Sequence, residues 1–330
     1  MTMSSDSDGS ATSAATIESV DGVERVGVLS GKRLARSLRI RGGARSRGFR
    51  SPQRQLVTYG LLILFAAIFI APFLLEAANS FKTDPDATAN GLSLIPHPFT
   101  LSAWDQIFGI GPNGGVGDFP RWLVNSCIVA VFITAGRVFL DSLAGYALAR
   151  LNFRGRRLVF ALVIATLAVP SVVLLIPQFL IIKQLGIFNS YPGMILPMMI
   201  DAAGIYMMRQ FFLQVPVALE EAARIDGATV FETYWRVVLP VVRPGLITLA
   251  ILSFQGAWNQ FAFFLVATVS PQYFTLTTGL ANIVGGGLGA GNQFPLKLGA
   301  ALLTTLPVAV LFFVFQKYLT QARLDSAVKG

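Results

Sequence analysis

Six apolar segments, each about 20 residues or longer, constrain this chain more than any other feature. A helix needs about 20 apolar residues to cross a hydrocarbon core of about 30 Å, where irregular backbone cannot satisfy its hydrogen bonds. With 54% hydrophobic and 13% charged residues, the 330-residue chain also has too few charges for a soluble domain. The sequence therefore predicts an all-α integral membrane protein with six transmembrane helices. The predicted spans are approximately 56–75, 122–148, 158–182, 191–213, 244–266 and 298–319.

The basic residues predict how these spans are oriented, because loops on the cytosolic side of a membrane carry an excess of Lys and Arg. Because six is an even number, both termini lie on the same side of the membrane. Of the 26 Lys and Arg residues, 21 fall on the side of the termini and four on the opposite side. Both termini are therefore predicted to be cytosolic. The basic segments are 1–55, 149–157, 209–243 and 317–330.

Residues 1–55 are rich in Ser, Gly and Arg and show no apolar period, which predicts a disordered basic cytosolic tail. Nine basic residues in its second half favour attraction to anionic membrane lipid. The net charge of +9 does not indicate nucleic-acid binding, because the basic residues follow the membrane topology. Residues 56–330 are expected to form the membrane domain.

Prolines interrupt three of the predicted spans and are expected to bend them, because each removes a backbone donor. Bent helices are typical of bundles that line a cavity. Proline is also tolerated where neighbouring helices satisfy the backbone, so a structural explanation stays open for each position. The positions are Pro170, Pro177, Pro197 and Pro307.

The loop 216–243 carries several charged residues and is predicted to form two short helices on the cytosolic face. Pro216 fits a first helical position, and Glu220 and Arg224 are spaced to pair four residues apart on the helix that follows. Val217, Ala218, Ala222 and Ile225 would lie near the opposite, apolar face.

Asp226 and Gly227 can end this first helix, since glycine accepts the left-handed conformation. Thr229 and Glu232 have the spacing of a capping box, which predicts a second helix through Trp235 before Leu239-Pro240 turns the chain back. From the residues alone, an interfacial helix lying among lipid headgroups is an alternative.

The same loop, EEAARIDGATVFETYWRVVLPVVRPGL, resembles the EAA loop of ABC importer permeases. The motif residues are Glu221, Ala222, Ala223, Gly227, Leu239 and Pro240. From about Leu56 onward the chain is similar to the maltose-type, second-permease family of bacterial carbohydrate importers, as in NSCIVAV, GYALARLNFRGRR and AWNQF. The resemblance implies the type I ABC importer permease fold, a multi-pass protein of the prokaryotic cell (inner) membrane, and import of a sugar or sugar derivative.

In that family the EAA loop is a pair of coupling helices that docks into a cleft on a cytosolic ATPase. The chain lacks a G-x-x-x-x-G-K-[ST] phosphate loop, so it is expected to bind no cofactor and to catalyse no reaction. ATP and Mg would be used by the partner ATPase dimer, and a second permease subunit and an extracytoplasmic solute-binding protein complete the implied partners. The predicted coupling residues are Glu220, Glu221, Ala222, Ala223, Arg224, Asp226, Gly227 and Ala228.

Gln255, Trp258, Asn259 and Gln260 place amides and an indole in the apolar fifth span, where polar groups are costly and usually face an interior. Amides and aromatic faces suit a polyhydroxyl solute, so these residues are candidates for the translocation path. Hydrogen bonding between helices is the structural alternative. The family often has a glutamate where this chain has the neutral Gln260. The resemblance therefore does not extend to a role that needs a negative charge at this position.

Three charged residues lie within other spans. Arg137 and Asp141 are spaced to neutralise each other on one helix face, and they are interpreted as a structural pair or a partner contact, with an ion relay as the alternative. Asp201 has no obvious local partner and is expected to hydrogen-bond a neighbouring helix. No metal site is predicted.

The loop 270–297 contains GGGLGAGNQF, which is expected to be flexible and not to pack a core of its own. In the family, the corresponding loop reaches toward a substrate-binding protein; an ordinary surface loop is the alternative.

Two other functions compete with a sugar importer. The chain could be an ABC importer permease for a peptide, amino acid or osmolyte, because only the resemblance across the spans favours sugar. It could also be a secondary transporter or channel in which Arg137, Asp141 and Asp201 carry ions. The lack of a visible inverted repeat argues weakly against the latter, and the EAA-like loop argues strongly.

Overall fold

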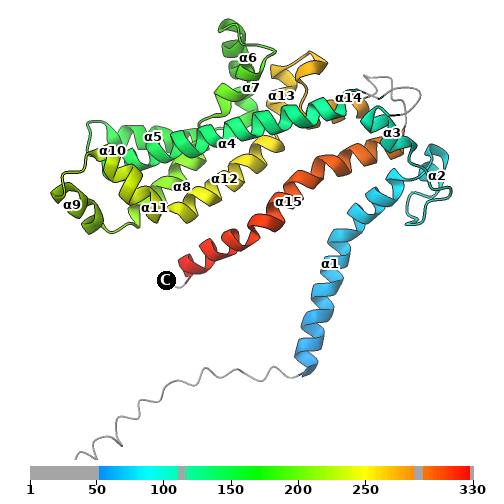
Figure 1. Ribbon diagram of the computed structural model, residues 1–330, viewed down its shortest axis with the longest axis horizontal. Helices are drawn as coiled ribbons and strands as arrows, with labels where there is room; N and C mark the ends of the chain where they lie inside the picture. Colours follow the sequence, from blue (N-terminus) through cyan, green and yellow to red (C-terminus); the bar gives the residue numbers. More distant parts are fainter. Residues whose placement is uncertain (1–51, 111–114, 116, 286–292, 328–330) are drawn as a thin grey trace, which may run out of the picture. The chain divides into compact units, whose positions relative to one another are not determined.

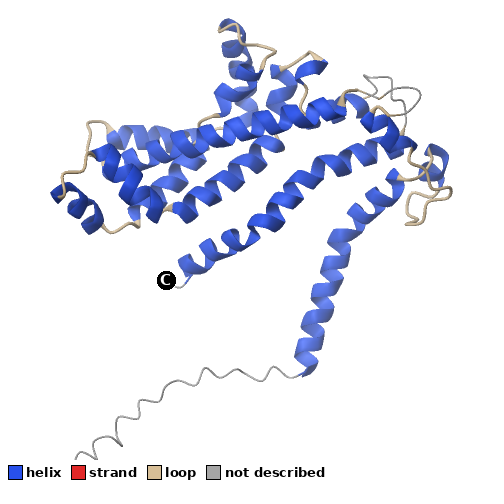
Figure 2. Cartoon of the chain, viewed as in Figure 1, coloured by secondary structure: helices blue, strands red, loops and turns tan. Residues whose placement is uncertain are grey.

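The computed structural model describes residues 52–110, 115, 117–285 and 293–327, and within them every regular element is a helix (Figures 1 and 2). The all-α prediction is therefore confirmed. The chain divides into two compact units, residues 1–63 and 64–330. The predicted tail lies outside the described residues up to Ser51. Helix α1 (Pro52–Ser80) begins four residues before the predicted first span.

Three described helices are long and apolar enough to cross a membrane unbroken: α1, α4 (Phe119–Arg150) and α15 (Phe294–Ala327). Two further candidates are bent pairs. In the first, α5 (Arg156–Leu167) meets the segment Ser171–Gln184 at 102°. In the second, Val230–Val241 meets α12 (Arg243–Trp258) at 82°. Length and composition thus give three to five spans in the described chain, and the predicted count of six is not reached.

The fourth predicted span accounts for the difference. The chain there forms α7 (Tyr191–Ile195), a short 3-10 helix (Leu196–Met198) and, after a break, α8 (Ala202–Leu213). Pro197 lies in the 3-10 helix, where its ring and missing N–H prevent a regular α-helix from continuing. The segment contains enough apolar residues for one crossing, but it is not one helix.

The other three prolines occupy different positions relative to their helices. Pro170 lies at the break after α5 and precedes the 3-10 helix Ser171–Leu174. Pro177 lies in the first turn of α6 (Leu175–Gln184), where an N–H has no helical partner in any case. Pro307 lies inside α15, which continues through it.

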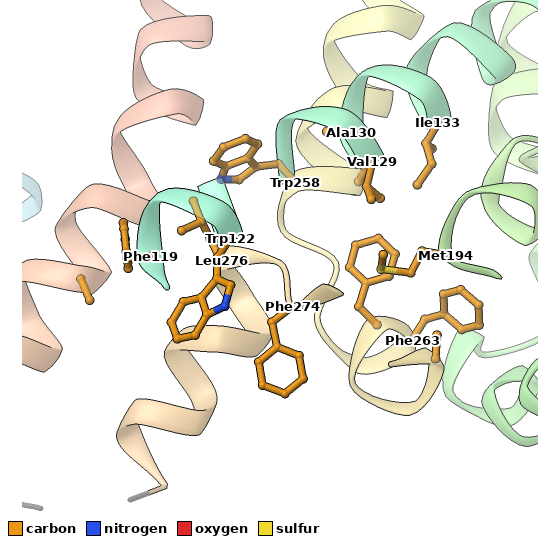
Figure 3. Close-up of a cluster of buried hydrophobic side chains, with 14 of the residues drawn as sticks. Phe119, Trp122, Val129, Ala130, Ile133, Met194, Trp258, Phe263, Phe274 and Leu276 are labelled. Atoms are coloured by element: carbon orange, nitrogen blue, oxygen red, sulfur yellow. The ribbon is translucent and has the colours of Figure 1, made fainter. Parts of the chain in front are cut away.

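Helix α4 is the centre of the larger unit and packs along α8 and α12 (Figure 1). At its first turns, buried apolar side chains from α4, α12, α13 (Ala262–Ala267) and the following loop form one cluster, in which Trp122 and Trp258 are fully enclosed (Figure 3). The Asn125 side-chain amide donates to the carbonyls of Gln272 (2.9 Å) and Phe274 (2.8 Å), so α4 also holds the loop that follows α13.

Part of the loop 270–297 is more ordered than predicted. After a 3-10 turn (Pro271–Tyr273) it forms α14 (Leu276–Val284), which packs on α4 and α15 and buries Leu276 and Ile283. Only glycine fits at Gly279, because a Cβ there would overlap the ring of Trp122. Most of the glycine-rich stretch lies outside the described residues.

The segment between α1 and α4 carries two short helices, α2 (Asp84–Ala89) and α3 (Ser102–Phe108). Lys82 is fully buried beneath this segment, and its ammonium donates to the carbonyls of Asn90 (2.8 Å) and Ser93 (2.7 Å). A buried charge is tolerated when its hydrogen bonds are satisfied, so Lys82 fixes the fold of the loop.

Candidate functional site

The predicted helix pair of the loop 216–243 is present. Helix α9 (Val217–Ile225) follows Pro216, which is the N-cap and not the first helical residue as predicted. The chain then turns at Gly227, whose φ of +83° is a left-handed conformation that favours glycine. Helix α10 (Val230–Glu232) starts at Thr229.

The predicted capping box is also present. The Thr229 hydroxyl accepts from the Glu232 N–H (3.3 Å), and the Glu232 carboxylate accepts from the Thr229 N–H (3.0 Å). The second helix does not end at Trp235, however. It continues as a π-helix (Thr233–Val238) and α11 (Leu239–Val241), so the chain turns at Val242 rather than at Leu239-Pro240. Pro240 sits in the first turn of α11, a position that tolerates proline.

The predicted pair between Glu220 and Arg224 is wrong. Glu220 is buried and its carboxylate Oε1 lies 3.0 Å from Nε of Arg150, the last residue of α4. Arg150 also donates through Nη2 to the carbonyls of Phe212 (2.7 Å) and Val215. Arg224 is exposed. Local spacing favoured the i, i+4 partner, but the packing of α9 turns Glu220 and Ala223 toward the bundle.

The outer side of the helix pair is exposed and combines charge with large apolar groups. Glu221, Ala222, Arg224, Asp226 and Gly227 are all exposed, whereas Ala228 is half-buried. The expected apolar side of α9 also faces outward, since Ile225 is 86% exposed. Val230, Phe231 and Trp235 extend this surface. We call the exposed side chains of residues 217–235 the coupling surface.

The sequence analysis did not predict that the apolar part of the coupling surface is exposed as one surface. Large exposed apolar side chains that lie together mark protein or membrane contacts. The signal available in the sequence was the pair of large aromatic residues Phe231 and Trp235, four residues apart in a loop that also carries charge.

The base of the helix pair is anchored by a buried aromatic cluster. Tyr234 packs against Tyr146 of α4 and Phe212 of α8, with ring centroids 5.1 and 6.2 Å away. Its hydroxyl hydrogen-bonds the Ser142 hydroxyl at 2.8 Å. Together with the Arg150–Glu220 pair, this cluster ties the coupling surface to α4 and α8 through buried contacts.

The four candidate path residues of the fifth span are separated by the structure. Trp258 is buried and its indole N–H donates to the Thr304 carbonyl of α15 (3.0 Å), which is a contact between helices. Gln255 and Asn259 are exposed. Gln260 is half-buried, with its amide nitrogen 3.8 Å from the Met198 sulfur.

Gln260 lines a half-open cavity of about 660 Å³ between α5, α6 and the start of α8. The cavity is mostly apolar, and its polar lining includes Arg137, Gln178 and Asp201. Gln178 was not singled out from the sequence, because a single glutamine in an apolar span gives no pattern. A mostly apolar cavity of this size with a few converging polar groups has the character of a small-molecule site.

Arg137 and Asp141 do not form the predicted mutual pair. Nε of Arg137 donates to the Met198 carbonyl (2.8 Å), and Oδ1 of Asp141 accepts from the Asp201 N–H (3.0 Å). Asp201, which was expected to bond a neighbouring helix through its side chain, is the N-cap of α8 and accepts from the Gly204 N–H (3.2 Å). These charged groups therefore hold the break before α8 in place.

Comparison with known proteins identifies transport proteins of the membrane as relatives of this chain. Residues 141–325 match the family described as "Binding-protein-dependent transport system inner membrane component". The arabinooligosaccharides transport system permease protein AraQ of Halalkalibacterium halodurans is 33% identical over 276 residues, which is 83% of this chain and 96% of that protein. The trehalose transport system permease protein SugB of Mycobacterium tuberculosis is 34% identical over 258 residues, which is 76% of this chain and 90% of that protein.

A third relative is the sn-glycerol-3-phosphate transport system permease protein UgpE of Yersinia pestis. It is 29% identical over 266 residues, which is 81% of this chain and 94% of that protein. The fold is also similar to a chain in the crystal structure of a bacterial ABC transporter involved in the import of the acidic polysaccharide alginate. The TM-score is 0.67 at 23% identity, over 80% of this chain and 95% of that chain.

Proposed function

Because the chain belongs to the family of binding-protein-dependent transport system inner membrane components, we propose that it is a permease subunit that carries a sugar or sugar derivative. It is a transport subunit and not an enzyme, and ATP hydrolysis belongs to a separate subunit. The curated relatives support the cargo class, since AraQ and SugB are named for the transport of arabinooligosaccharides and trehalose.

The observation that carries the proposal is the coupling surface on an anchored base. Glu221, Ile225 and Phe231 are exposed on the outer side, whereas Glu220 and Tyr234 are buried on the inner side. A surface of this kind suits docking to a cytosolic ATPase, because its outward groups are free to contact a partner while its inner groups hold it rigid. Closure of the ATPase dimer would then move α4 and α8 through the Arg150–Glu220 pair and the tyrosine cluster.

Solute is proposed to pass along the side of the fifth span that carries the amides. Gln260 would contact it from the 660 Å³ cavity, and the exposed amides of Gln255 and Asn259 would face the same path once a second permease subunit stands opposite. Amide groups donate and accept hydrogen bonds, which matches the hydroxyl groups of a sugar. Trp258 is excluded from this set by its buried position.

The remaining parts of the proposal concern assembly and orientation. The partners are a second, different permease subunit, a dimer of cytosolic ATPases and an extracytoplasmic solute-binding protein. Both termini lie in the cytosol of a prokaryotic cell. The basic segments 149–157 and 209–243 support this orientation, because the pair of Arg150 and Glu220 brings them together at one end of the bundle.

Co-purification of the full-length chain with its cytosolic partners tests the assignment directly. An affinity-tagged chain extracted from its own membrane is expected to retain an ATPase and a second permease. Recovery of the folded chain without any ATPase would overturn the coupling proposal. Uptake of labelled sugars by cells with and without the gene tests the cargo, and uptake of an amino acid or peptide alone would overturn the sugar assignment.

A further inference from the structure

A cavity of about 790 Å³ lies at the same end of the bundle as the coupling surface but is separate from it. It is formed by the turn between α4 and α5, the first turn of α5 and one side chain of α8. We call it the arginine pocket, because four arginines line it together with Asn152 and Phe160: Arg154, Arg156, Arg157 and Arg209. Its volume falls within the range of roughly 300–1,000 Å³ that is usual for small-ligand sites.

Two of the four guanidinium groups are held in place by the protein. Arg156 donates to the carbonyls of Ala149 (3.1 Å) and Leu151 (3.3 Å) and to the Asn152 side chain (3.3 Å). Arg209 donates to the Leu148 carbonyl (3.3 Å), and its guanidinium carbon lies 4.0 Å from the centre of the Phe160 ring. Arg154 and Arg157 are exposed at the rim. The pocket thus has a fixed inner pair and an adaptable outer pair.

Within the described part of the chain, no carboxylate neutralises the positive charge of the pocket. Across the described residues, ion pairs join Arg121 to Asp118, Arg150 to Glu220 and Arg236 to Glu232, and none reaches these four arginines. Four like charges that share one cavity repel one another, so a bound anion lowers their electrostatic energy. Guanidinium groups also match phosphate oxygens in geometry, because the planar group donates two parallel hydrogen bonds.

The start of α5 adds to the attraction for an anion. The helix has 12 residues, begins at Arg156 and has no side-chain cap, and its N-cap Gly155 lines the pocket. The first N–H groups of a helix and its dipole favour negative charge at this position. This effect supports the arginines and would not by itself define a site.

The surroundings of the pocket distinguish a lipid from a free phosphate ion. Phe153 at its edge is 41% exposed, and Leu158 and Leu162, which follow directly along α5, are 66% and 58% exposed. Exposed apolar side chains one turn apart on a membrane helix suit contact with acyl chains. A ligand with a phosphate at one end and hydrocarbon at the other would satisfy both parts.

We propose that the arginine pocket binds the phosphate-bearing headgroup of an anionic phospholipid in the leaflet on the predicted cytosolic side. The proposal rests on the membrane orientation given under the proposed function, but on neither the cargo nor the ATPase. A lipid bound there would brace the turn 151–156 next to Arg150, and so support the anchor of the coupling surface.

Lipid binding to the full-length chain in detergent tests the proposal, with phosphatidylglycerol and phosphatidylcholine as probes and native mass spectrometry as the readout. The variant Arg154→Gln/Arg157→Gln removes the exposed pair, whose guanidinium groups make no hydrogen bond to the described residues. Its affinity for phosphatidylglycerol is expected to fall on the order of 10- to 30-fold, from the usual contribution of each arginine near an anionic surface. Phosphatidylcholine should bind weakly to both proteins.

The control is Arg236→Gln/Arg243→Gln, which removes two exposed arginines outside the pocket from the same predicted side, one of them paired with Glu232. It should change phosphatidylglycerol binding by less than about threefold. An equal loss in both double variants would show general surface attraction and overturn the proposal, as would unchanged binding in the pocket variant. Inorganic phosphate or glycerol phosphate should compete only weakly, and competition as strong as that of the lipid would overturn the lipid assignment.

A second measurement uses the unmodified chain. Hydrogen exchange of residues 152–160 should be slower in nanodiscs of phosphatidylglycerol than in nanodiscs of phosphatidylcholine, while exchange in α14 should not differ. Equal exchange of residues 152–160 in both lipids would contradict the proposal. Because neither measurement involves ATP or solute, its outcome is independent of whether an ATPase or a sugar is found.

Discussion

Nε of Arg150 and Oε1 of Glu220 lie 3.0 Å apart and join the end of α4 to the first turns of α9. Both side chains are almost fully buried, with 9% and 5% of their surface exposed. The adjacent Glu221 is exposed. Two neighbouring glutamates therefore have different tasks: one fastens the coupling surface to the bundle, and the other is available to a partner.

The first prediction separates these tasks. Glu220→Ala leaves a buried guanidinium without its counter-charge, and removal of one partner of a buried pair costs about 3–5 kcal/mol. Thermal unfolding in detergent should show this loss, and hydrogen exchange in α9 should accelerate. Glu221→Ala is the control and should stay within about 0.5 kcal/mol, as is usual for an exposed site. Equal stability of the two variants would contradict the anchoring role of Glu220.

The second prediction concerns transport. Glu221→Ala and Gly227→Pro should each leave the protein in the membrane but uncouple solute uptake from ATP hydrolysis. The first removes an outward charge, and the second prevents the positive φ of the turn between α9 and α10. The assay compares uptake and ATPase activity in the reconstituted complex. Normal uptake in both variants would refute the coupling role.

The third prediction tests the apolar part of the coupling surface. Ile225→Asp should weaken binding of the ATPase by about tenfold or more, as expected for an apolar anchor at an interface centre. Leu92→Asp is a matched control, because Leu92 is also 86% exposed but lies in the loop predicted to be on the other side of the membrane. Co-purification yields and titrations with the ATPase measure the difference. A similar effect of both substitutions would mean that Ile225 makes no specific contact.

The fourth prediction distinguishes residues of the fifth span that contact the solute from a residue that stabilises the fold. Gln260→Leu should reduce solute affinity by about two- to tenfold, the usual effect of losing one hydrogen bond. Asn259→Leu should alter affinity or selectivity in the same assay. Trp258→Phe should instead lower thermal stability without changing solute affinity, because its indole bonds Thr304 of α15. Solute binding that depends on Trp258 and not on the two amides would reverse this assignment.

The fifth prediction concerns the loop after α1. Lys82→Met removes the charged donor to the carbonyls of Asn90 and Ser93, and a hydrogen bond from a charged group contributes about 1.5–3 kcal/mol. The midpoint of thermal unfolding should therefore fall clearly. Lys183→Met, at an exposed lysine, should have little effect. If the two variants unfold at the same temperature, the buried lysine does not stabilise the loop.

The features that the sequence predicted well are those set by neighbouring residues. The capping box of Thr229 and Glu232 and the turn at Gly227 depend on interactions within three or four residues. The helical class follows from the long apolar segments, because a segment that crosses the bilayer must satisfy its own backbone hydrogen bonds and does so as a helix. Such features can be read without knowledge of the packing.

The features that it missed depend on contacts between distant segments. Glu220 had a plausible local partner in Arg224, and only the packing of α9 against α4 brings Arg150 closer. Asp201 offered an N-cap signal before α8, but the apolar residues around it suggested one continuous span. In the fifth span, residue type alone could not separate buried Trp258 from exposed Asn259.

The chain bends by 82° at Val242, between the segment Val230–Val241 and α12, so these two helical segments have the shape of an angled lever. One segment is Val230–Val241, half of which is the π-helix Thr233–Val238, so it is shorter than the roughly 18 Å that an α-helix of its length would span. The other is α12, whose 16 residues span about 24 Å at about 1.5 Å per residue. A rigid corner would carry a movement of the shorter segment to the far end of α12 enlarged by about one third or more. Such a linkage changes the direction of a movement and enlarges it moderately. Under the proposed coupling, the stiffness of the corner around buried Val242 would limit how much of the movement reaches the transport path.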